Sequence, residues 1–91
     1  MFTICTTKHF RENHEIIVSM DIDHNGGVCV YIHRALTIVE TEQITDTICE
    51  SLGITDALFY KRISAYIYFV SQNEDDINIE DDEISMNIYF I

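Results

Sequence analysis

The chain has 91 residues, which is the size of one domain with a single hydrophobic core. Its composition, 47% apolar and 23% charged, is that of a globular protein rather than a disordered chain. It carries 16 acidic and 5 basic residues, for a formal net charge of -11. Because nucleic acids and anionic lipids are bound through Lys and Arg, this charge argues against direct binding to DNA, RNA or a membrane.

Cysteine usage and the N-terminal segment indicate the compartment. The three cysteines, Cys5, Cys29 and Cys49, are odd in number and widely spaced, whereas small secreted domains usually have a dense, even set. The start of the chain lacks the pattern of a signal peptide, and no apolar run is long enough to span a bilayer. We therefore expect a soluble, cytoplasmic protein with free thiols.

Three strands are predicted in the first third of the chain. Residues 2–7 are rich in β-branched side chains, and residues 15–23 and 28–33 alternate between apolar and polar positions. The glycines at 26 and 27 favour a three-residue hairpin turn between the second and third strands. In the expected register, Ile22 faces Val30.

Helices are predicted next. Apolar residues recur at helical spacing over 41–52, after a potential N-cap at Thr41 and before Gly53. A second cap predicts a short helical segment over 55–62.

Two more alternating segments, 65–70 and 84–90, predict the last strands, and the acidic segment 72–83 between them is expected to be a solvated loop. The order of elements predicts a single α+β domain over 1–91. It has a five-stranded, mostly antiparallel sheet with one or two helices between the third and fourth strands.

The sequence contains none of the common catalytic motifs, so we expect a binding protein rather than an enzyme. Cys5 and His9, and likewise Cys29 and His33, have ligand types that zinc prefers. In a strand, however, residues four apart are separated by about 13 Å, which is too far for one ion. We expect no metal at these pairs and no cofactor.

The segment 21–28 resembles the first eight positions of an EF-hand calcium loop, with oxygen ligands at Asp21, Asp23 and Asn25 and a glycine at the sixth position. The twelfth position, which is a bidentate Glu in that family, is Ile32 here. The flanking residues also alternate like strands. A hairpin turn with two acids beside it is therefore the favoured interpretation.

The segment 48–62 resembles the helix-turn-helix of bacterial repressors, with Gly53 in the turn and Thr55 opening the second helix. This resemblance makes a transcriptional regulator an alternative function. Asp56 would lie against the base edges, however, and the segment offers only two bases, Lys61 and Arg62, for phosphate contacts.

Tyrosines accompany the acidic residues. Tyr31, Tyr66, Tyr68 and Tyr89 fall on expected strand positions opposite the apolar ones. Tyrosine is enriched at protein interfaces because it buries an apolar ring and keeps a polar tip. The alternatives are a solvated sheet face and tyrosines buried by the helix.

In size, charge and its dense acidic run, the chain resembles the class of small phage-type inhibitors that includes DNA mimics and anti-CRISPR proteins. That resemblance implies carboxylates that stand in for phosphates on a basic, nucleic-acid-binding partner such as a nuclease or CRISPR effector. Immunity proteins and antitoxins that neutralise basic nucleases rely on the same physics. The expected partner-binding residues are Glu74, Asp75, Asp76, Glu80, Asp81, Asp82 and Glu83, a second patch of Asp21 and Asp23, and the aromatic Tyr66, Tyr68 and Tyr89.

Overall fold

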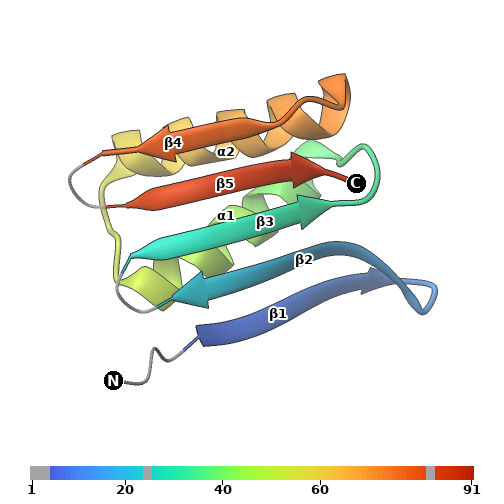
Figure 1. Cartoon of the computed structure of the whole chain (residues 1–91), viewed down its shortest axis with the longest axis horizontal. Coiled ribbons are helices and arrows are strands. Elements are labelled where there is room, and N and C mark those ends of the chain that lie inside the picture. The colour runs from blue at the N-terminus through green and yellow to red at the C-terminus, as the bar shows by residue number, and fades with distance from the viewer. Residues whose placement is uncertain (1–4, 24–25, 82–83) are drawn as a thin grey trace.

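Five strands and two helices make up the domain, and the helices lie between the third and fourth strands (Figure 1), so the predicted α+β fold is confirmed. The computed structural model describes residues 5–23, 26–81 and 84–91. The elements are β1 (Cys5–Glu12), β2 (Glu15–Asp23), β3 (Gly27–Ile32), α1 (Ile38–Leu52), α2 (Ala57–Asn73), β4 (Ile77–Glu80) and β5 (Ser85–Phe90).

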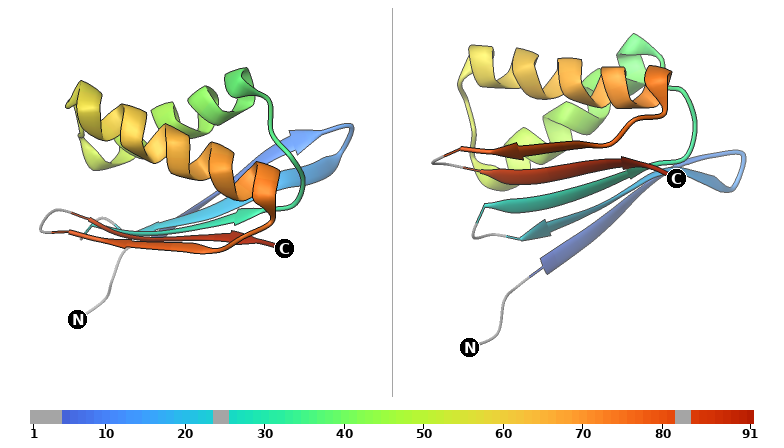
Figure 2. Two further views of the ribbon diagram at one scale, coloured as in Figure 1. Left: turned by 90° about the horizontal axis from the view of Figure 1, so that it is seen from above. Right: turned by 45° about the horizontal axis from the view of Figure 1, so that its top comes forward.

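The sheet has the strand order β1-β2-β3-β5-β4. Its neighbours are antiparallel except β3 and β5, which run parallel. Parallel strands need a crossover connection, and α1 and α2 belong to it. Both helices cover the same face of the sheet, so the opposite face carries no helix (Figure 2).

The hairpin between β2 and β3 has the predicted turn length but a different register. Asp23 pairs with Gly27, which leaves a loop of three residues. Of these Gly26 is described, with a positive φ of 99° that suits glycine. Ile22 pairs with Val28, so the expected register was wrong by two residues. The apolar face is unchanged, because a shift of two keeps every side chain on its side of the sheet.

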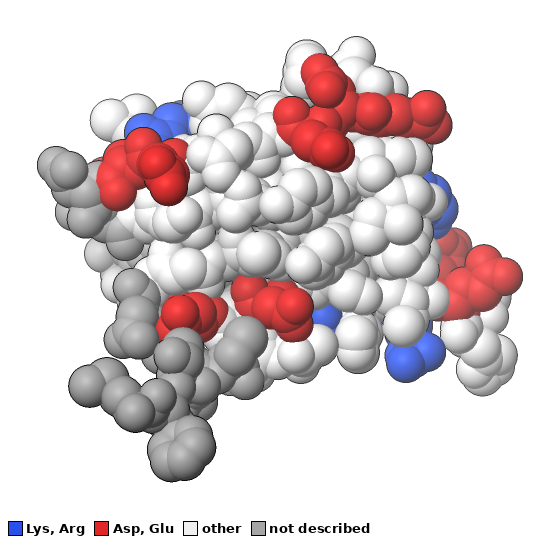
Figure 3. Space-filling model, in the orientation of Figure 1, with Lys and Arg blue, Asp and Glu red and all other residues white. Residues whose placement is uncertain are grey.

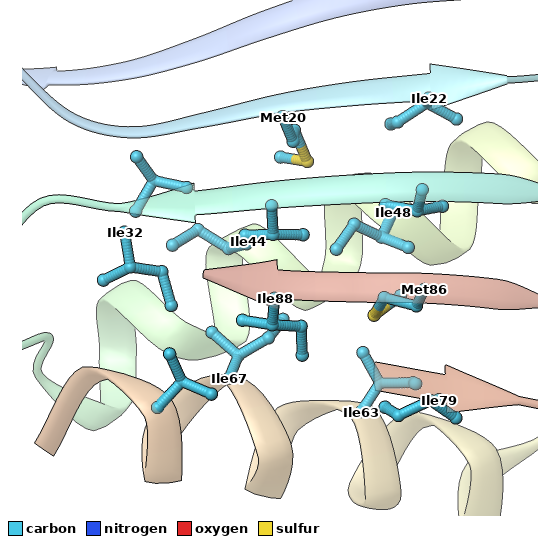
Figure 4. Packing of buried hydrophobic residues seen from close by; sticks show 14 of the residues in the cluster. Met20, Ile22, Ile32, Ile44, Ile48, Ile63, Ile67, Ile79, Met86 and Ile88 are labelled. Carbon is cyan, nitrogen blue, oxygen red and sulfur yellow. The ribbon is translucent and has the colours of Figure 1, made fainter. Parts of the chain in front are cut away.

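The core fills the space between the helices and the sheet (Figure 4). Isoleucine, valine and methionine from β2, β3 and β5 face isoleucines from both helices. Complete burial of one such side chain contributes about 1.5–3 kcal/mol, and several are fully inaccessible, including Met20, Ile22, Ile32, Ile44, Ile48, Ile63, Ile67, Met86 and Ile88. This packing holds both helices against one face of the sheet.

The prediction of a strand over 65–70 is wrong, because these residues lie in α2. Phe59, Ile63, Ile67 and Val70 recur with the helical period and are all buried against the sheet. The gain from burying this stripe outweighs the strand preference of the aromatic residues between them. At the other end of the helix, the Asp56 side chain accepts a hydrogen bond from the Leu58 N–H.

The prediction of a solvated loop over 72–83 is also wrong in part, because Gln72 and Asn73 are the last residues of α2 and Ile77–Glu80 forms β4. This strand pairs antiparallel with β5. Ile79 is buried and Ile77 packs against the core, so two apolar residues among carboxylates suffice to make an edge strand. The acidic residues on either side remain at the ends of the strand.

The start of α1 lies one turn before the predicted N-cap. Thr37 is the N-cap: its hydroxyl accepts from the Glu40 N–H, and the Glu40 carboxylate accepts from the Thr37 N–H. Thr41, the expected cap, is buried in the first turn. Arg34 donates to Glu40 at 2.7 Å and also to Glu12, which ties the end of β1 to the start of α1.

These contacts stabilise the charged form of Glu40. The Arg34 guanidinium, followed by the Thr37 N–H, lowers the pKa of Glu40 from 4.5 to about 2. Because the pKa is lower in the folded state, the stabilisation is complete above the unfolded value and is lost as the pH falls from about 4.5 to about 2.

We predict that Glu40→Gln lowers the free energy of unfolding by about 1–2 kcal/mol at neutral pH, since the partly exposed pair is screened by solvent. Urea denaturation at several pH values measures it. The difference from wild type should vanish as the pH approaches about 2. Glu42→Gln, at an exposed position of the same helix, is the control and should have little effect. A difference in the free energy of unfolding that stays constant with pH would contradict a stabilising role for the charged form of Glu40.

Candidate protein-binding surface

The sheet face opposite the helices is the first candidate surface, and we call it the open sheet face. Its side chains alternate with the core residues along β3, along β5 and along β2 from Val18 onward. Figure 3 views the molecule from this side. The residues at these positions are Thr7, His9, Ser19, Asp21, Asp23, Cys29, Tyr31, Asn78, Glu80, Ser85, Asn87 and Tyr89.

A tyrosine pair lies on the inner strands β3 and β5 of the open sheet face, near the C-terminal ends of both strands. Tyr31 and Tyr89 are partners in the parallel β3–β5 pairing. Their rings stack with centroids 5.6 Å apart and planes inclined by 21°. The nearby Cys29 side chain and partial burial raise the pKa of Tyr31. The pair is an apolar platform with hydrogen-bonding tips, as expected for an interface anchor.

The polar side chains around this pair are held by neighbouring strands. The Thr7 hydroxyl donates to Asp21 at 2.7 Å, and the Asn78 amide donates to Asn87. Across β2, β3 and β5, the register places Cys29 between Asp21 and Asn87. These bonds join β1 to β2 and β4 to β5, so the face is ordered before any partner binds.

Many acidic residues lie toward the margins of this view, and a broad band across the face carries no charged side chain (Figure 3). Asp21 and Asp23 of β2 lie on the face itself. Glu74, Asp75 and Asp76 precede β4, whereas Glu80 and Asp81 lie at its end. A four-residue strand spans about 13 Å, so the predicted single cluster is divided into two. The predicted residues Asp82 and Glu83 lie outside the described part of the chain.

Two of these carboxylates also stabilise the fold. Asp76 accepts a hydrogen bond from the Phe90 N–H at 3.2 Å. Asp81 accepts from the Ile84 N–H at 3.0 Å and pairs with Arg62 at 2.5 Å. The exposed Glu74, Asp75 and Glu80 are thus better candidates for steering a partner.

The structure does not bring the predicted tyrosines together. Tyr89 lies on the open sheet face, as predicted, and Tyr31 lies beside it. Tyr66 and Tyr68 belong to α2 instead: Tyr66 packs against the core, whereas Tyr68 lines a groove between the helices. The expectation that all four share one strand face was wrong because it depended on a strand over 65–70.

The groove between α1 and α2 was not predicted from the sequence. It has a volume of about 460 Å³. Its lining is mostly apolar and includes Ile38, Ala57, Tyr60, Ala65 and Tyr68. Once 57–73 is known to be one helix, the spacing of Ala57, Ala65 and Tyr68 around it identifies this side, but alternation over 65–70 concealed that period.

The segments that resemble other families have the following structures. Asp21 and Asp23 lie on β2, and residues 24–25 of the calcium-like segment are not described. Among the residues that the structure describes, no group of three or more His, Cys, Asp and Glu side chains could hold a metal ion.

Both helices of the repressor-like segment exist, and α2 runs back over the sheet beside α1 (Figure 2).

No known protein family, curated protein or solved structure matches this chain. In its described part, no helix is long and apolar enough to cross a membrane. Function is accordingly inferred from the open sheet face, its acidic margins and the helix groove.

We predict that metals do not affect stability. Thermal melts in EDTA, in calcium and in zinc should superimpose, because Ile32 replaces the bidentate ligand of the calcium-like segment. A midpoint raised by several degrees in sub-millimolar calcium would instead show that residues 21–28 bind the ion.

Proposed function

We propose that this protein is a small acidic inhibitor that occupies a basic, nucleic-acid-binding surface of a partner protein, in the manner of DNA mimics and anti-CRISPR proteins. The observation that carries the proposal is the open sheet face, which combines the Tyr31–Tyr89 stack on the inner strands β3 and β5 with exposed carboxylates at both ends of the edge strand β4. An uncharged aromatic centre inside a charged rim is the usual anatomy of a protein interface.

The dimensions of the molecule support this use. It extends 36 × 28 Å across its two longer axes, which define the view onto the sheet. A standard interface buries about 800 Å² on each partner, and the face is large enough for one. Because its residues belong to paired strands, little conformational entropy is lost on binding.

The two parts of the surface have different tasks. The stacked tyrosines bury apolar area and slow dissociation. The marginal carboxylates Glu74, Asp75 and Glu80 attract a Lys/Arg surface and speed association, in competition with nucleic-acid phosphates. An immunity protein or antitoxin against a basic nuclease would use the same surface, so the partner's identity separates these two alternatives.

Affinity capture from lysate at low salt, followed by competition with DNA, tests the proposal. Protein captured by wild type should bind a fluorescent DNA duplex and release it when this protein is added in stoichiometric amount. Tyr89→Lys should abolish capture, because it places a cation in the centre of the interface. Tyr68→Lys is the matched control on α2 and should leave capture intact. Captured protein that keeps its DNA, or that binds both variants equally, would refute the proposal.

We predict that the triple variant Glu74→Gln, Asp75→Asn and Glu80→Gln associates with the captured partner about tenfold more slowly, with a shallower salt dependence. Stopped-flow association at several salt concentrations measures both. The triple variant Glu42→Gln, Asp46→Asn and Glu50→Gln removes the same charge from α1 and controls for net charge. Equal on-rates and salt slopes in wild type and the first variant would show that these carboxylates only aid solubility.

We also predict that the isolated protein does not bind duplex DNA at about 0.15 M salt, because its negative field repels phosphates. Fluorescence anisotropy with a mixed-sequence duplex checks this. Sequence-specific binding with nanomolar affinity would instead favour the helix-turn-helix regulator, with α2 as its recognition helix.

A further inference from the structure

The outer surface of the helices is unusually apolar for a chain of this charge. Six large apolar side chains are exposed in the described residues, and five lie on the helices. They are Ile38, Val39, Leu58, Tyr68 and Phe69, with exposed fractions of 64, 63, 77, 38 and 46%. With the groove beside Ile38 and Tyr68, they form a surface typical of a protein contact.

Charge is divided unequally between the two helices. α1 contains Glu40, Glu42, Asp46 and Glu50 and no base, whereas α2 contains Lys61 and Arg62 and no acid. Glu40 and Arg62 are engaged in ion pairs within the chain. Two groups of opposite charge therefore remain in the groove lining, Glu42 on α1 and Lys61 on α2.

This division makes the surface complementary to itself. The Tyr60 hydroxyl donates to the Glu42 carbonyl at 3.2 Å, so Glu42 and the neighbour of Tyr60, Lys61, line the same part of the groove. A two-fold axis over this part of the groove lets Lys61 of one copy face Glu42 of the other, and the pair then forms twice.

We propose that this helix surface is the interface of a homodimer. A second copy suits it because α2 has no acidic residue, so the repulsion between two chains of charge -11 is least there. Two short helices present a footprint near the small end of specific interfaces, so the dimer is reversible and concentration-dependent. Both open sheet faces point outward, and the inference does not depend on the proposed function.

Sedimentation velocity of the full chain from about 5 to about 500 µM tests the dimer. The mass should rise from 10.6 kDa toward twice that value. Glu42→Lys and Lys61→Glu should each weaken dimerisation at least about tenfold, and the double variant should restore it because the reversed charges pair again. Circular dichroism confirms that each variant is folded.

Two charge reversals outside the groove are the matched controls. Glu50→Lys on α1 and Lys8→Glu on β1 change the net charge equally and should leave the dimer unchanged. Wild type that stays monomeric at the highest concentration would overturn the proposal. A double variant no stronger than the single ones, or controls that weaken the dimer as much, would overturn it as well. None of these results bears on capture through Tyr89.

Discussion

Burial of apolar side chains on one side of the sheet is the constraint on which the rest of this structure depends. The isoleucine faces of α1 and α2 pack on the same face of the sheet, and Ile48, Ile63 and Ile67 are completely inaccessible there. Because both helices are used on this face, the other is left to polar and aromatic side chains. The domain thus presents two unlike surfaces, an open sheet and a pair of helices.

The parallel pairing of β3 with β5 determines the centre of the open sheet face. It joins a strand from the first half of the chain to the C-terminal strand and makes Tyr31 and Tyr89 neighbours. The crossover through the helices is what allows this pairing. The aromatic platform is therefore a consequence of how the helices pack, although both rings lie on the opposite face of the sheet.

Net charge alone overstates the acidic surface that a partner could use. Glu40 caps α1 and pairs with Arg34, while Asp76 and Asp81 hold the ends of β4. These carboxylates accept hydrogen bonds from backbone N–H groups and pair with two guanidinium groups, those of Arg34 and Arg62, so they serve the fold first. The carboxylates available for steering are the exposed ones at the margins of the open sheet face, such as Glu74.

The periodicity of apolar residues and the helix-capping residues in the sequence determined much of this fold. Alternation over 15–23 predicted β2 with its correct bounds, and Asp56 marked the start of α2. The local sequence pattern gave a wrong prediction where a strand period and a helix period overlap. Residues 65–70 alternate like a strand, but Ile63 and Ile67 belong to an apolar stripe with helical spacing. Burial of this stripe on the sheet makes the segment a helix. Tertiary structure alone decided that β4 forms, because its few apolar residues gain stability only when paired with β5. Only the tertiary structure brings together the stacked tyrosines and forms the groove between the helices, since each of these features combines residues that are far apart in the sequence.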